Sequence, residues 1–148
     1  MAKVNGCNLP EDLYYLIEKH IWAKPKDDGT VRVGMTTVAG KLAGGKLAGA
    51  TVKRKAVGKE VAQGKSIATI ESSKYVGPVH SPVSGTLLRG NEKLASDPNL
   101  VIEDPYGEGW IAEIQPNDWE AEKGSLVTGA EGIAAYQAKL DADGVSCE

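Results

Sequence analysis

The fold is decided by residues 71–85, which read ESSKYVGPVHSPVSG. A strand-like run, residues 66–70, precedes this stretch, and Thr86-Leu87-Leu88 resumes a strand after it. The pattern places Lys74 in a tight turn between two strands, and a proline- and glycine-rich exit follows. A turn holds the lysine amine in water, where a modifying enzyme can find it and acylate it. Most of the 17 lysine and arginine residues are expected to be plain surface charges, so the context of Lys74 matters.

Length and composition predict one small, mostly β domain. A chain of 148 residues is long enough to bury a core, and its 18 glycines and seven prolines divide it into short segments. Asp28-Gly29 predicts a hairpin between residues 21–23 and 31–33. Since phenylalanine is absent, the tryptophans, tyrosines and aliphatic residues must fill the core.

Two segments have helical rather than strand-like patterns. Residues 37–45 are rich in small side chains and predict a short helix that ends at a glycine. Ile133, Tyr136 and Leu140 recur at helical spacing and predict a C-terminal helical segment packed on the strands. Glycines are expected to break this segment before residue 130.

The residues around Lys74 resemble the lipoylation site of the glycine cleavage H protein family, in which a Glu-Ser-x-Lys hairpin precedes a Pro-x-Ser-Gly stretch. Both halves are present, at residues 71–74 and 81–85. Further blocks resemble the family in the same order: residues 10–15, 20–22, 28–36, 57–64, 91–101 and 104–110. The resemblance therefore covers roughly residues 10–116 and is specific, whereas an isolated Glu-Ser-x-Lys would be a weak signal.

The resemblance implies a lipoyl/biotinyl-type barrel-sandwich hybrid with a short internal helix and a C-terminal helical segment. It divides the chain into an N-terminal extension (1–9), a lipoyl-carrier domain (10–116), and a C-terminal helical segment with a tail (117–148). It also implies a cofactor, lipoate, in amide linkage to Lys74, added by a lipoate ligase or a lipoyl synthase-type enzyme. Glu71, Ser72, Ser73, Tyr75 and His80 complete the expected site. Glu71 would fix the turn or present a charge to the modifying enzyme, and His80 would tune a thiol nearby.

Departures from the family pattern decide the expected pathway. They are the aromatic Tyr75 directly after the lysine, the early Pro78, the basic run at residues 53–55, Ile102, and the tail with Cys147. These features resemble the lipoate-binding protein branch that serves sulfur oxidation. We therefore expect a carrier of sulfur intermediates for a heterodisulfide-reductase-like complex.

Three alternatives to the sulfur carrier stay open. The first is an H protein of the glycine cleavage system, which carries the aminomethyl group between glycine decarboxylase, aminomethyltransferase and dihydrolipoyl dehydrogenase. The second is a biotin carrier, although biotinylated lysines usually lie between methionines and Lys74 lies between Ser73 and Tyr75. The third is an unmodified interaction module.

Charge and hydropathy limit the partners and the compartment that we expect for this protein. A net charge of −3 makes neither nucleic acid nor an anionic membrane the default partner. No apolar run approaches the length of a membrane span, and residues 2–8 are polar, so a cytoplasmic protein is expected. No Ser-His-Asp grouping or metal-ligand spacing appears, which indicates a carrier rather than an enzyme.

The last predictions concern the two cysteines, the C-terminal tail and His20. Cys7 and Cys147 are expected to be free thiols in a reducing compartment. Residues 139–148 offer no apolar anchor, so a mobile tail is expected and Cys147 should be dispensable for folding. His20 is expected to be structural.

Overall fold

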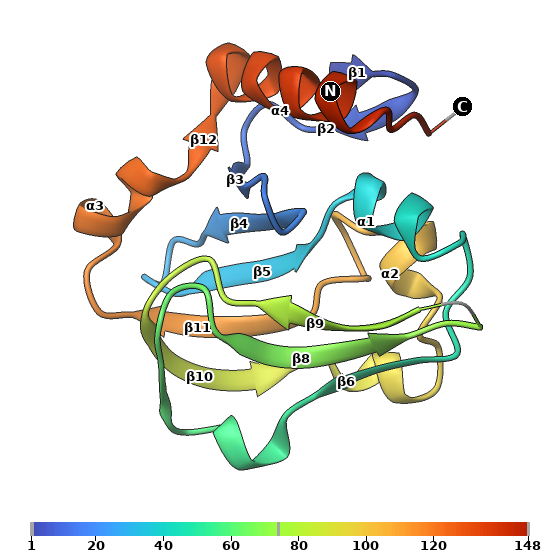
Figure 1. Cartoon of the computed structure of the whole chain (residues 1–148). Coiled ribbons are helices and arrows are strands. Elements are labelled where there is room, and N and C mark those ends of the chain that lie inside the picture. The colour runs from blue at the N-terminus through green and yellow to red at the C-terminus, as the bar shows by residue number, and fades with distance from the viewer. Residues whose placement is uncertain (1, 74, 148) are drawn as a thin grey trace.

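The structure is a computed structural model that describes residues 2–73 and 75–147, and strands make up most of its regular elements (Figure 1). The strands are β1 (Ala2–Val4), β2 (Cys7–Leu9), β3 (Tyr14–Leu16), β4 (Ile21–Pro25), β5 (Val31–Met35), β6 (Gly49–Val52), β7 (Glu60–Val61), β8 (Ser66–Glu71), β9 (Val76–His80), β10 (Gly85–Gly90), β11 (Ala112–Pro116) and β12 (Val127–Thr128). The helices are α1 (Thr37–Leu42), α2 (Leu100–Glu103), α3 (Trp119–Glu122) and α4 (Gly129–Asp143), with 3-10 turns η1 (Arg54–Ala56), η2 (Glu92–Ala95) and η3 (Lys123–Ser125).

Two antiparallel sheets form the body of the molecule. The larger sheet has seven strands in the order β12-β3-β4-β5-β11-β10-β7, and the smaller has three in the order β6-β8-β9. In Figure 1 the three-stranded sheet lies across the larger one. This arrangement confirms the predicted barrel-sandwich fold, together with its short internal helix α1 and its C-terminal helix α4.

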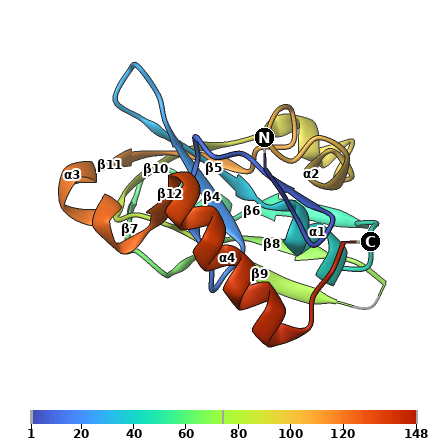
Figure 2. The ribbon, with the colours of Figure 1, turned by 90° about the horizontal axis from the view of Figure 1, so that it is seen from above.

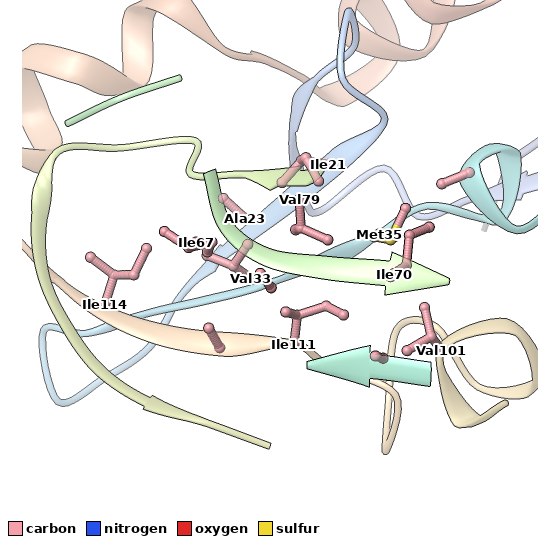
Figure 3. Packing of buried hydrophobic residues seen from close by; sticks show 14 of the residues in the cluster. Ile21, Ala23, Val33, Met35, Ile67, Ile70, Val79, Val101, Ile111 and Ile114 are labelled. Atoms are coloured by element: carbon pink, nitrogen blue, oxygen red, sulfur yellow. The ribbon is translucent and has the colours of Figure 1, made fainter. Parts of the chain in front are cut away.

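The main core fills the space between the two sheets. Figure 3 shows Ile67 and Val79 of the small sheet facing Val33 and Ile114 of the large sheet. Each of these four side chains is fully buried, at 0% exposure. Burying one such aliphatic side chain contributes about 1.5–3 kcal/mol, so this cluster fixes the orientation of β8 and β9, the strands that carry the candidate site.

The predicted Asp28-Gly29 hairpin connects β4 and β5. Gly29 has a φ of +86°, a backbone conformation that side chains disfavour. The Lys26 amide donates to the Thr30 carbonyl at 2.8 Å, and the Asp28 carboxylate accepts from the Thr30 amide at 3.0 Å. Local turn chemistry therefore sets the register of the central strands, as the sequence predicts.

Helix α4 lies over the opposite face of the large sheet beside the β1–β2 hairpin (Figures 1 and 2). It begins at Gly129, where φ is +67°, and ends at Asp143, after which Gly144 caps the helix in the left-handed conformation. Tyr136 and Leu140 are fully buried in a second apolar cluster, which confirms the helical spacing read from the sequence.

The predictions of free thiols and of a mobile tail without an anchor are wrong. Cys7 and Cys147 form a disulfide with a Cα–Cα distance of 5.0 Å. The Asn5 carbonyl accepts the Cys147 amide at 2.9 Å, and the Asn5 side chain donates to Asp141 at 3.0 Å and to the Val145 carbonyl at 3.3 Å. The tail is polar but docked, because the β1–β2 hairpin supplies hydrogen-bond partners. These partners are far from the tail in the sequence, so the sequence did not indicate the contact.

Candidate functional site

The β8–β9 hairpin brings the candidate site residues 71–73 and 75 to one end of the small sheet. Glu71 pairs with Val76 in the ladder, and Ser72 donates its amide to the Tyr75 carbonyl at 2.7 Å. The Ser72 hydroxyl donates to the same carbonyl at 3.3 Å. The ladder closes at Ser72 and Tyr75, so only residues 73 and 74 connect its ends, as in a two-residue hairpin. Lys74 itself lies outside the described residues.

Strand β8 is held on both sides up to this hairpin end. Its Glu71 pairs with Gly49 of β6, and the Ala48 amide donates to the Glu71 carbonyl at 2.7 Å. On the inner face Ile70 is 2% exposed. The hairpin is therefore a fixed platform, because its central strand is paired on two edges and buried on one face.

The side chains that flank the connection are open to solvent. Tyr75 is 46% exposed and Val76 is 66% exposed, while Glu71 and Ser73 are exposed as well. The Tyr75 phenol lies back over Gly77, where a Cβ would collide with the ring. Gly77 therefore allows the aromatic ring to lie along β9.

His80 is not brought to the same place. It pairs with Ser66 at the other end of the β8–β9 ladder from Glu71, and it is half-buried. Burial lowers the pKa of His80, and the nearby charge of Lys19 lowers it further. The hairpin thus gathers residues 71, 72, 73 and 75 and leaves His80 at its base.

A buried carboxylate on the large sheet was missed by the sequence reasoning. Glu113 of β11 is 1% exposed and forms ion pairs with Lys26 at 2.8 Å, with Arg32 at 3.0 Å, and with Arg89. Burial raises the pKa of Glu113, but hydrogen bonds from Lys26 and Arg32 outweigh it and lower the pKa below its ordinary value. Its cationic partners come from the β4–β5 hairpin and from β10, far from Glu113 in the sequence. The residues next to Glu113 in β11 therefore do not reveal the network.

The hairpin fits a lysine-linked prosthetic group. Such a group needs a lysine in a short connection, exposed neighbours and a rigid base, and residues 71–76 supply the last two. Between residues 2 and 147, leaving out position 74, no three His, Cys, Asp or Glu side chains gather as metal ligands. No helix in the same described ranges is long and apolar enough to cross a bilayer. The fold and the hairpin define a small β carrier domain of the lipoyl/biotinyl type.

Comparisons with known proteins narrow this class. Residues 13–139 match the family model described as "Glycine cleavage H-protein". The chain is 42% identical over 147 residues to "Glycine cleavage system H protein 2" of Aquifex aeolicus, covering 99% of this chain and 89% of the relative. It is 46% identical to "Glycine cleavage system H protein 5" of the same organism, with 99% of each covered.

A solved structure gives the same result. The crystal structure of a glycine cleavage system H protein from Mycobacterium marinum superposes with a TM-score of 0.72 at 32% identity, covering 93% of this chain and 100% of that one. The chain belongs to the glycine cleavage H-protein family. Members of the family are non-catalytic carriers whose cofactor is lipoate, bound covalently to a lysine.

The expected sulfur-oxidation function is wrong. The relatives found from Aquifex aeolicus, Sulfurisphaera tokodaii and Pyrococcus abyssi are all named as glycine cleavage system H proteins or probable ones. Tyr75 and the basic run at 53–55 are therefore departures within this family and do not indicate a sulfur carrier. The heterodisulfide-reductase-like complex was expected as a partner only for the sulfur-oxidation function, so it is withdrawn together with that function.

Proposed function

We propose that this protein is the lipoyl-carrying H protein of a glycine cleavage system, with lipoate in amide linkage to Lys74. The observation that carries the proposal is the β8–β9 hairpin, whose ladder closes at Ser72 and Tyr75 and leaves residue 74 in a two-residue connection. The names of the relatives at 42% and 46% identity support the pathway. The chain itself performs no catalysis in this proposal.

The residues at the hairpin end have separate roles. Ser72 fixes the turn through its amide and hydroxyl, and Glu71 presents a carboxylate beside the attachment site. Ser73 and Tyr75 border the arm, while His80 supports the base of the hairpin. When bound, lipoate supplies a redox-active pair of sulfurs that takes up the aminomethyl group. The chain supplies the rigid base from which the arm moves between active sites.

The proposed partners follow from this role. A lipoate ligase or a lipoyl synthase-type enzyme would modify Lys74, and glycine decarboxylase, aminomethyltransferase and dihydrolipoyl dehydrogenase would act on the arm. The proposal keeps residues 1–9 as the N-terminal extension, 10–116 as the carrier domain and 117–148 as the C-terminal segment, and the cytoplasm as the compartment. The β1–β2 hairpin and α4 pack together in one apolar cluster.

Mass spectrometry tests the attachment site. Protein produced with a competent lipoate ligase is expected to gain the mass of one lipoyl group, because the sequence between β8 and β9 contains one lysine. Lys74→Arg keeps the charge but removes the acylated amine, so it should abolish the gain. Lys65→Arg, at the exposed turn before β8, is the matched control and should be modified like the wild type. A lipoyl group on the Lys74→Arg variant contradicts the assignment.

A coupled assay tests the pathway. The lipoylated protein is incubated with glycine decarboxylase, and the exchange of labelled bicarbonate into glycine is followed. Exchange at a rate comparable with that of an established H protein is expected, and the Lys74→Arg variant should support none. No exchange by fully lipoylated protein contradicts a role in glycine cleavage.

A further inference from the structure

A pocket of about 560 Å³ opens on the side of the molecule that carries β6. This η1 pocket lies between β6, η1, the end of β10 and η2. Its floor is apolar, with Ile111 and Leu94 buried at 1% and 3% exposure. At the rim, Val57 is one of the few large apolar side chains left exposed, at 41%. Pockets of this size and lining suit an inserted apolar group.

A strongly cationic segment borders the η1 pocket. Residues 53–59 read KRKAVGK, with four cations and no acid, in a chain whose net charge is −3. Of the four, Arg54 lines the pocket. None of them forms an ion pair within the described part of the chain, whereas Arg89, on the opposite rim, is paired with Glu113. Glu92 is the one acidic lining residue, and the surplus of unpaired positive charge lies in the segment 53–59 that borders the pocket.

The cationic segment is fixed in place by backbone hydrogen bonds at both ends. The Lys53 amide donates to Ile67 of β8 at 3.0 Å. The Gly58 amide donates to Leu87 of β10 at 2.7 Å, and the Leu87 amide donates to Lys59 at 3.0 Å. A segment held in this way loses little freedom on binding, which favours its use as a recognition surface.

The η1 pocket lies beside the strand that leads to the candidate attachment site. Ala50, which lines the pocket, pairs with Ile70 of β8, four residues before Lys74. Ile70 is the last residue but one of β8, so the pocket lies close to the hairpin end of the strand. Figure 1 shows β6 alongside β8, and the first residue of β6, Gly49, pairs with Glu71 at the hairpin end. A protein bound at the pocket would therefore have the arm next to it.

We propose that the η1 pocket and its cations Lys53, Arg54 and Lys55 form the docking surface for an acidic segment of a glycine cleavage enzyme. One apolar side chain of that segment enters the pocket while its carboxylates meet the unpaired cations. This inference rests on the proposed function. Charge complementarity selects the occupant, because unpaired surface cations raise the association rate and the specificity for an acidic partner face.

Charge reversal tests the cationic segment. The full chain is lipoylated, modification is confirmed by mass, and steady-state kinetics are measured separately with glycine decarboxylase, aminomethyltransferase and dihydrolipoyl dehydrogenase. Arg54→Glu/Lys55→Glu is expected to raise KM for the carrier about tenfold with at least one enzyme, with little change in kcat. Lys3→Glu/Lys24→Glu changes by the same total charge two exposed lysines far from the pocket, neither of which has an ion pair among the described residues, and should leave KM within about twofold.

Filling the pocket tests its apolar floor. Ala95→Trp places a large ring in the η1 pocket, and Ala62→Trp places one on an exposed turn as the control. Direct binding of unlipoylated protein to the same enzymes is measured at low and high salt, so this arm of the test does not depend on modification. Ala95→Trp should weaken binding about tenfold, and the salt dependence should be smaller for Arg54→Glu/Lys55→Glu than for the wild type.

The outcomes separate this inference from the proposed function. Absence of lipoylation or of glycine exchange counts against the proposed function, and direct binding still reports on docking. If the charge-reversed and pocket-filled variants match their controls in KM and in direct binding with all three enzymes, the docking surface is overturned.

Discussion

At the scale of single residues, His20 connects the start of β4 to the C-terminal helix. It adopts a positive φ of 58°, and its Nδ1 lies 2.7 Å from the Tyr136 hydroxyl, which in turn lies 2.8 Å from the Thr36 hydroxyl. Burial lowers the pKa of His20 from 6.5 to about 4, and Lys139 contributes in the same direction. The imidazole is therefore neutral in the folded protein at pH 7, in accord with the structural role expected from the sequence.

The free energy of unfolding, measured as a function of pH, should reveal the lowered pKa of His20. Since the folded-state pKa of about 4 is below the unfolded value, the unfolded state takes up a proton first as the pH falls. The contribution of neutral His20 to stability is complete above about pH 6.5 and is lost progressively between 6.5 and 4. His20→Asn tolerates the positive φ but does not titrate. The free energy of unfolding, measured in urea, should therefore fall more steeply for the wild type over this range.

His80 does not confuse this comparison, because it is present in both proteins and its contribution cancels in the difference. Parallel profiles for the wild type and His20→Asn would show that His20 keeps an ordinary pKa in the folded protein.

At the scale of elements, the sequence predicted the turns and helices that depend on residues close together in the chain. The Asp28-Gly29 turn and the helical spacing in α4 depend on residues close together in the sequence, and the structure reproduces both. The Glu113 network is different, because its cations come from β5, from β10 and from the β4–β5 turn. A sequence read along one strand cannot show which charges the sheet brings opposite one another.

The β8–β9 hairpin leads to a prediction about Glu71. Its backbone is paired with Gly49 and Val76, so its conformation does not depend on its side chain, and the carboxylate is exposed. Glu71→Ala should therefore keep the melting temperature but lower the initial rate of lipoylation by about three- to tenfold, because the modifying enzyme loses a charge contact. The rate is followed by intact mass against time.

Glu11→Ala, which removes an exposed carboxylate elsewhere on the surface, is the control for net charge. If Glu71→Ala is modified as fast as this control and the wild type, Glu71 has no part in recognition by the enzyme.

At the scale of the whole molecule, the two ends of the chain are brought together over the large sheet. The β1–β2 hairpin, α4 and the residues after it share one apolar cluster, which includes Val4, Leu9 and Leu140. The sequence could not reveal this packing, because the contacts join segments separated by 140 residues. Two cysteines near the termini, read alone, fit free thiols as well as a bridge.

Reduction of the disulfide should lower stability. A bridge that closes a loop of this length restricts the unfolded chain strongly, and its loss typically costs about 2–4 kcal/mol. Cys147→Ser is expected to lower the free energy of unfolding by this amount, measured by urea denaturation. Dithiothreitol should destabilise the wild type to the same extent and leave Cys147→Ser unchanged. Equal stability of the oxidised wild type and the variant would contradict a stabilising bridge.

The disulfide also makes almost the whole polypeptide a covalent ring. Residues 7–147 form a closed circuit of peptide bonds and one sulfur–sulfur bond, and the β8–β9 hairpin lies within that circuit. A protease that cuts once inside the ring opens it without separating any fragment. Nicked protein would therefore keep both pieces, the arm included, on one molecule until a reductant acts. Electrophoresis of the same digest with and without reductant would distinguish one band from two.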